Sequence, residues 1–94
     1  MDMHNEHRMA FGEILSQIGS RKVVVGAKQL RKALNSNSVF CVFVAENADP
    51  AITDPIVELC QSNCVQYAWV KTMVDLGKAC GIEVGAAAAA AVNS

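Results

Sequence analysis

Apolar residues return at every third or fourth position in four segments of the chain, a spacing that predicts amphipathic helices. These segments are residues 9–18, 27–34, one ending near residue 62, and 73–80. The first ends at Gly19-Ser20, and the last has Gly81 as a left-handed C-terminal cap. The third has two possible starts, because Asp49-Pro50 and Asp54-Pro55 each place a capping carboxylate before a proline at the first helical position.

Four other segments predict β-strands. They are residues 23–25, 39–45, 65–70 and 86–92. The segment 39–45 is apolar on both faces, which suits a central strand covered by helices on either side. The last segment is ambiguous, because its six alanines, residues 86–91, have the highest helix propensity. A helix there would be too short to be stable alone, whereas small side chains suit a strand pressed between two helical layers, so we predict a strand.

The alternation of helices and strands predicts an α/β fold in which a four-stranded sheet lies between helical layers. The 94 residues, 52% hydrophobic and 18% charged, are enough for one domain with a core. Residues 1–8 are polar and of mixed charge, so we expect a flexible N-terminal tail followed by a single domain over residues 9–94.

The location expected from the sequence is the cytoplasm. No apolar run reaches the roughly 18 residues that span a bilayer, so no membrane association is expected. The polar first residues are unlike a secretory signal, and the four cysteines are therefore expected to be reduced thiols.

Positive charge gathers in one part of the chain. The eight Lys and Arg residues and nine Asp and Glu residues give a net charge of −1. No acidic residue lies between Glu13 and Glu46, however, whereas five basic residues do: Arg21, Lys22, Lys28, Arg31 and Lys32. Such a one-sided distribution is of the kind that positions phosphate groups. The alternative is a solvated helix face whose counter-charges come from other segments.

The segment 26–32 is the strongest candidate site, because it lies where a strand gives way to a helix. The first N–H groups of a helix lack partners and carry the positive end of its dipole, so an anion fits there. A lysine in this first turn, Lys28, is unfavourable for the dipole, which suggests a bound phosphate. Lys32 shares its face, Arg31 lies beside both, and Gln29 can both donate and accept hydrogen bonds to a base edge. An exposed charged helix remains the alternative.

A second candidate loop, residues 81–85, has two glycines around an apolar-acidic-apolar triplet. Ile82 and Val84, which flank Glu83, could contact an unstacked base. Alternatively, they could be core residues at the start of a strand.

No catalytic, metal or cofactor site is predicted. Cys60 and Cys64 have three residues between them and no second closely spaced pair, so zinc is not expected. Cys41 lies in an apolar run, and His4 and His7 lie in the predicted tail. The common phosphate-loop, hydrolase and dinucleotide motifs are absent, and we expect no enzyme.

Three stretches in collinear order resemble one known family. They are GAKQLRKA at residues 26–33, VAENADP at residues 44–50 and LGKACGIEVGAA at residues 76–87. The chain resembles the kink-turn RNA-binding ribosomal proteins of the L7Ae and L30e type, and among them the small bacterial YbxF-like branch. The resemblance implies a three-layer α/β/α sandwich with a four-stranded mixed sheet. It also implies binding to a sharply bent RNA helix whose bend is built from sheared G·A pairs.

The resemblance further implies roles for particular residues. Gly26 and Ala27 would bring the backbone close to RNA, Lys28 and Gln29 would read guanine edges, and Lys32 would hold phosphate. Other residues implied near the RNA are Arg31, Asp49, Thr53, Lys78, Ile82, Glu83 and Val84. The Lys28-Gln29 pair departs from the Asn-Glu of many members and leaves the preferred base pairs open.

The sequence therefore predicts a non-catalytic protein that recognises and stabilises kink-turn RNA. The expected partner is a ribosomal or riboswitch RNA, with the ribosome as a further expected partner, and the protein itself is expected to be a monomer. The alternative is a protein-interaction module on the same fold with weak or lost RNA binding.

Overall fold

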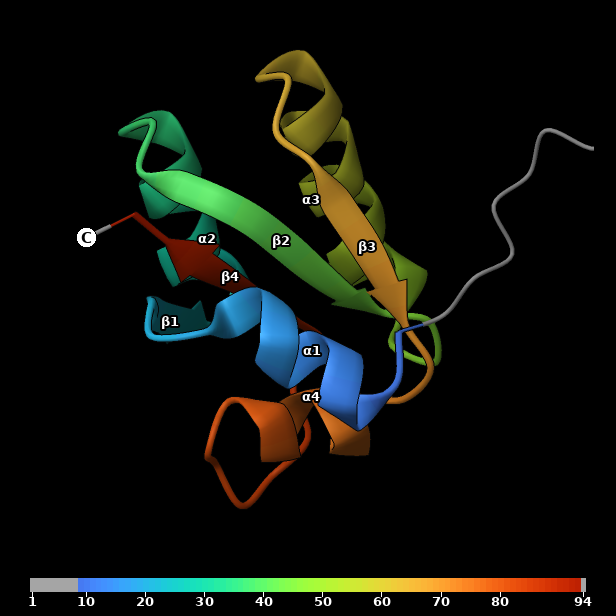
Figure 1. Cartoon of the computed structure of the whole chain (residues 1–94). Helices are drawn as coiled ribbons and strands as arrows, with labels where there is room; N and C mark the ends of the chain where they lie inside the picture. The colour runs from blue at the N-terminus through green and yellow to red at the C-terminus, as the bar shows by residue number, and fades with distance from the viewer. Residues whose placement is uncertain (1–8, 94) are drawn as a thin grey trace, which may run out of the picture.

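The structure is a computed structural model that describes residues 9–93. The predicted tail, residues 1–8, lies outside the described residues. The elements are α1 (Phe11–Ile18), β1 (Lys22–Val25), α2 (Ala27–Asn35), β2 (Val39–Ala45), α3 (Pro50–Ser62), β3 (Tyr67–Val70), α4 (Met73–Ala79) and β4 (Ala88–Val92). Their order confirms the predicted alternation of helices and strands (Figure 1). No helix within residues 9–93 is long and apolar enough to cross a membrane.

The four strands form one mixed sheet in the order β1-β4-β2-β3. Strand β4 is antiparallel to both of its neighbours, whereas β2 and β3 are parallel. Strands β1, β2 and β3 therefore run in the same direction, and their carboxyl ends meet at one end of the sheet. At this end the chain passes from β1 to α2, from β2 to α3, and from α4 into β4.

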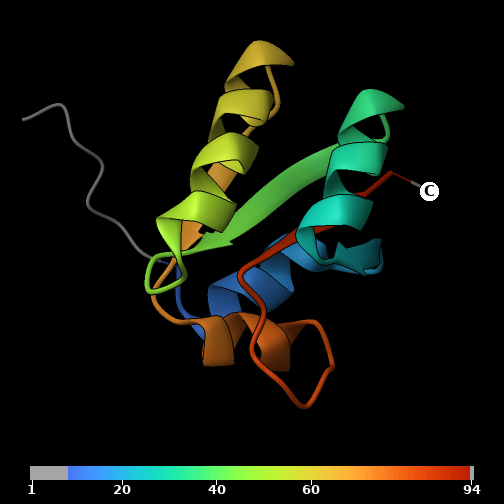
Figure 2. The same cartoon turned by 180° about the vertical axis from the view of Figure 1, so that it is seen from behind.

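Two helices cover each face of the sheet. Helices α1 and α4 pack on one face (Figure 1), where Ile14 and Leu76 join Phe43 in a buried cluster. Helices α2 and α3 pack on the other face (Figure 2), where Leu30 and Ile56 belong to a second cluster. The helices of each layer thus bury their apolar stripes against opposite faces of one sheet, and the predicted three-layer sandwich is confirmed.

The alanine-rich segment is the central strand β4, as predicted, although it begins at Ala88 and not at residue 86. It pairs with β1 on one side and β2 on the other, and Ala88 to Ala91 are each at most 1% exposed. Pairing on both sides satisfies every peptide group of a short segment, which a single helical turn cannot do. Tertiary structure therefore outweighs the helix propensity of alanine here.

Several predicted boundaries, those of α1, β1, α2, β3, α4 and β4, differ from the structure by one or two residues, and the structure decides between the two possible starts of α3. Helix α1 begins at Phe11, because the N–H of Met9 donates to the carbonyl oxygen of Trp69 at 2.8 Å and adds Met9 to the end of β3. Helix α3 uses the first of its two possible starts: the carboxylate of Asp49 accepts from the N–H of Ala51 at 3.0 Å, and Pro55 lies inside the helix.

Candidate functional site

The junction between β1 and α2 leaves the start of a helix open. Gly26 has a φ of 101°, a conformation that favours glycine, and its N–H donates to the carbonyl oxygen of Ala88 at 3.3 Å. The first bond of the helix runs from the N–H of Leu30 to the carbonyl oxygen of Gly26, at 2.9 Å. Among residues 9–93, no group accepts a hydrogen bond from the N–H groups of residues 27–29, and no side chain caps α2.

The exposed side of α2 carries the predicted polar residues. Leu30 and Leu34 anchor the helix in the core, at 0% and 1% exposure. Lys28, Gln29, Arg31 and Lys32 are exposed, and none of the three cations forms an ion pair within the described part of the chain. Exposed positive side chains therefore lie on the same helix as three open N–H groups that themselves carry the positive end of the helix dipole, an arrangement that attracts an anion.

The loop between α4 and β4 lies at the same end of the sheet. It begins with a Schellman motif, in which Gly81 has a φ of 79° and the N–H of Ile82 donates to the carbonyl oxygen of Gly77 at 3.0 Å. The predicted cap at Gly81 is thus confirmed. Ile82 packs against the α1/α4 core cluster, whereas the side chain of Val84 is 70% exposed and Glu83 is exposed. The two apolar residues of the triplet therefore have different surroundings.

The loop between β2 and α3 is held by its own polar side chains. The Asp49 carboxylate is exposed and caps α3, as described above, and Thr53 is only 3% exposed. The side-chain oxygen of Asn47 accepts from the N–H of Met73 at 2.9 Å and so joins this loop to the start of α4. The Asp49 side chain is thus accessible to a ligand at this end of the sheet, whereas the Thr53 side chain is almost entirely buried.

Hydrogen bonds bring these loops together at the entrance to β4. The N–H of Gly26 donates to the carbonyl oxygen of Ala88, and the N–H of Ala45 donates to the carbonyl oxygen of Ala87 at 2.9 Å. The start of α2 and the end of β2 therefore flank the segment that leaves the α4–β4 loop. Lys78 is exposed in the last turn of α4, just before that loop. The structure thus gathers the predicted residues from three separate segments at one end of the sheet.

Sequence reasoning missed the residues that support the loops. Gly77 is buried in α4, and a Cβ atom there would overlap the carbonyl oxygen of Val84, so only glycine allows the loop to pack this closely. A glycine inside a short helix was the available signal, since it costs helix propensity. For Asn47 no sequence signal exists, because its partner lies 26 positions away.

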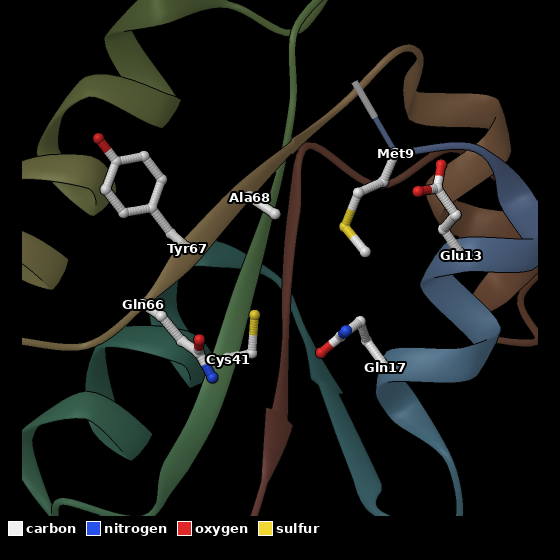
Figure 3. A pocket seen from close by; sticks show the side chains of 7 residues that line it. All are labelled: Met9, Glu13, Gln17, Cys41, Gln66, Tyr67 and Ala68. Carbon is white, nitrogen blue, oxygen red and sulfur yellow. The ribbon is translucent and has the colours of Figure 1, made fainter. Parts of the chain in front are cut away.

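A pocket of about 290 Å³ lies elsewhere, between α1 and the β2–β3 side of the sheet. It is lined by Met9, Glu13, Gln17, Cys41, Gln66, Tyr67 and Ala68 (Figure 3). Gln66 also donates to the carbonyl oxygen of Phe40 at 3.1 Å, which holds its amide in place. None of the predicted site residues lines this pocket, so it is separate from the loops at the sheet end.

Three of the four cysteines are buried or partly buried, whereas Cys64 is exposed. Burial, with a smaller contribution from Cys41, raises the pKa of Cys60 to about 11, and burial also raises the pKa of Cys41 and of Cys80. These thiols therefore stay protonated at neutral pH. Within residues 9–93 no three His, Cys, Asp or Glu side chains gather as metal ligands would.

Solved structures share this fold. The Giardia lamblia 15.5kD RNA binding protein superposes with a TM-score of 0.76 at 23% identity, covering 86% of this chain and 68% of that one. A protein of unknown function from Bacillus halodurans superposes with a TM-score of 0.75 at 21% identity, covering 87% of this chain and 86% of that one. At such identities the likeness establishes the architecture.

Sequence comparison establishes the family. An RNA-binding protein of Bacillus pumilus is 48% identical over 71 residues, which cover 76% of this chain and 87% of the relative. RNA-binding protein YbxF of Geobacillus stearothermophilus is 42% identical over 69 residues, covering 73% and 84%. The family profile matches residues 12–94. The resemblance seen in the three stretches is thereby confirmed, and the chain belongs to the ribosomal protein L7Ae/L30e/S12e/Gadd45 family.

Proposed function

We propose that this protein binds RNA without catalysing a reaction, and that it recognises kink-turns through the β1–α2 junction and the α4–β4 loop. The observation that carries the proposal is the open start of α2, where three N–H groups and Lys28 face solvent beside loops from two other segments. The printed names of the bacterial relatives, RNA-binding proteins at 42–48% identity, support the same function.

The geometry of RNA explains why a bend is the preferred target. An A-form helix has a major groove too narrow for side chains, so its base edges become readable only where the helix is distorted. Sheared G·A pairs at a kink expose such edges. The start of α2 can enter there, with its N–H groups and Lys32 contacting phosphates while Lys28 and Gln29 meet guanine edges.

The α4–β4 loop would cover the nucleotides that a kink leaves unstacked. The Val84 side chain offers an exposed apolar surface, and the adjacent Ile82 fixes the loop to the core. Contact between an apolar side chain and a base removes both from water and is tolerant of base identity. Because the complex is stabilised only in the bent state, binding shifts the RNA population toward the kink.

The cellular setting is part of the same proposal. A ribosomal or riboswitch RNA in a bacterial cytoplasm is the partner we propose, with the protein acting as a monomer. Membership of a family that contains ribosomal proteins and the bacterial origin of the similar proteins support this choice.

The direct test compares affinity for a kinked RNA and for a straight duplex of the same length and composition. We expect the kinked RNA to bind roughly 100-fold more tightly or better, since only it offers readable edges. Lys28→Gln and Lys32→Gln should each weaken binding by about 1–3 kcal/mol. Lys71→Gln is the matched control, because Lys71 follows β3 at the other edge of the sheet. Equal affinity for the two RNAs would refute shape recognition, whereas weak binding to both RNAs that changes little with salt would favour the protein-interaction alternative.

A further inference from the structure

Four of the five basic residues between Glu13 and Glu46 lie on one flank of the molecule, formed by the edge strand β1 and by α2. We call this surface the basic flank; its residues are Lys22, Lys28, Arg31 and Lys32. All four side chains are exposed. The helical spacing of the last three places them within about 100° of one another around the axis of α2, so they form one stripe.

The fifth basic residue, Arg21, is committed elsewhere. Its guanidinium carbon lies 3.6 Å from the centre of the Phe40 ring. Alternation along β1 explains the difference from its neighbour: Val23 packs against the α1/α4 cluster and Val24 against the α2/α3 cluster. Arg21 therefore shares the face of α1, whereas Lys22 shares the face of α2.

The basic flank extends well beyond the loops at the sheet end. Lys22 pairs with Val92 at the opposite end of β4 from Ala88, to which Gly26 is bonded. Gly26 lies four positions after Lys22 along extended chain, a distance of about 13 Å. Because the adjacent strand β4 consists of alanines and one valine, it adds no opposing charge.

The other side of α2 has the opposite charge. Helix α3 packs against α2 on the same face of the sheet and carries the exposed carboxylates of Asp54 and Glu58, with Asp49 exposed at its start. A strand of phosphates that leaves the start of α2 is therefore attracted along β1 and repelled along α3.

We propose that a helical arm of the bound RNA runs along the basic flank and away from α3, with Lys22 contacting its phosphates. This inference rests on the proposed RNA binding and adds to it the direction of the arm and a contact outside the loops. Such a contact is to backbone and carries no base specificity, so it strengthens binding to any arm sequence and makes binding more sensitive to salt.

The test is a double-mutant cycle between Lys22→Gln and single methylphosphonate substitutions, which replace a charged phosphate by a neutral group, along both arms of a kinked RNA. We expect Lys22→Gln to weaken binding roughly three- to tenfold and to lower the salt slope by about one. At one arm phosphate, the neutral substitution should weaken RNA binding by the unmodified protein. It should not weaken binding by Lys22→Gln further, because that variant has already lost the contact between residue 22 and this phosphate. Lys71→Gln, at the diagonally opposite corner of the sheet, has the same change in charge and should show no such coupling.

The outcomes separate this inference from the function on which it rests. If some arm phosphates showed coupling to Lys28→Gln but no arm phosphate showed coupling to Lys22→Gln, the proposed direction of the arm would be wrong, whereas the proposed RNA binding would stand. Unchanged affinity of Lys22→Gln for every RNA would lead to the same conclusion. Failure of the unmodified protein to prefer the kinked RNA would overturn both. Thermal unfolding of Lys22→Gln should match that of the unmodified protein, since the side chain is exposed.

Discussion

Helices α2 and α3 occupy equivalent places in the fold, yet their first turns differ. Both lie on the same face, both follow parallel strands, and both begin at the same end of the sheet. At the start of α3, Pro50 has no N–H, the Asp49 carboxylate accepts from Ala51, and the carbonyl oxygen of Asp49 accepts from Ile52 at 2.9 Å. At the start of α2, Gly26 offers no side-chain acceptor and residues 27–29 keep their N–H groups open.

The difference shows that local residues, and not the architecture, decide which helix start is available to a ligand. An aspartate closes the start of α3 with the protein's own negative charge, which stabilises the helix. Gly26 leaves the start of α2 open, and Lys28, two positions later, adds a charge that the helix dipole disfavours. A bound phosphate would complete α2 as the carboxylate of Asp49 completes α3.

The largest expected effect comes from giving α2 a negative charge of its own. Lys28→Glu places a carboxylate in the first turn, where it repels phosphate and interacts favourably with the dipole. We expect RNA affinity to fall by about 100-fold or more, while the free energy of unfolding is unchanged or rises by about 0.3–1 kcal/mol. Filter binding and urea unfolding measure the two effects. Lys71→Glu is the control, and a Lys28→Glu protein that retains full affinity would contradict the account.

The next effect tests the loop beside the open helix start. Gly77→Ala adds a Cβ atom that overlaps the Val84 carbonyl oxygen and displaces the α4–β4 loop. We expect a loss of about 2 kcal/mol in stability and a weaker RNA complex. Gly12→Ala is the matched control, because a Cβ atom there meets nothing within 4 Å. This change should raise stability by up to about 1 kcal/mol. Equal stability of the two variants would show that the close packing of Gly77 is unimportant.

The smallest effect concerns the closed helix start. Asp49→Ala removes the acceptor for the Ala51 N–H, so we expect the protein to lose about 1 kcal/mol of stability and its melting temperature to fall by roughly 4–8 °C. Asp49→Asn keeps an acceptor oxygen and should lose much less. Calorimetry distinguishes the two; if both variants melted together, charge and not capping would be the role of Asp49.

Most of the fold could be predicted from local patterns. The spacing of apolar residues predicted the four helices, and the two-sided apolar run of residues 39–45 predicted a central strand. The alanines of β4 show the limit of propensity, since burial between helices decided their structure. The pairing of Met9 with Val70 could not be foreseen, because it depends on residues distant in sequence.

The geometry of the candidate site was predictable in part. The open start of α2 follows from Gly26 and from the charges after it, and parallel strands bring loops to one end of a sheet. The different surroundings of Ile82 and Val84 could not be read from a symmetrical triplet, and the position of Arg21 over Phe40 depends on which way a strand residue faces. These are properties of tertiary packing.

Amide hydrogen exchange, measured with and without a kinked RNA, tests the central claim most directly. In the free protein the N–H groups of residues 27–29 should exchange fast, because no group within residues 9–93 accepts from them, whereas those of Ala51 and Ile52 should already be protected. We predict that RNA slows amide exchange at residues 27–29 and changes the exchange rates of Ala51 and Ile52 little. Exchange at residues 27–29 that is as fast in the complex as in the free protein would contradict the account.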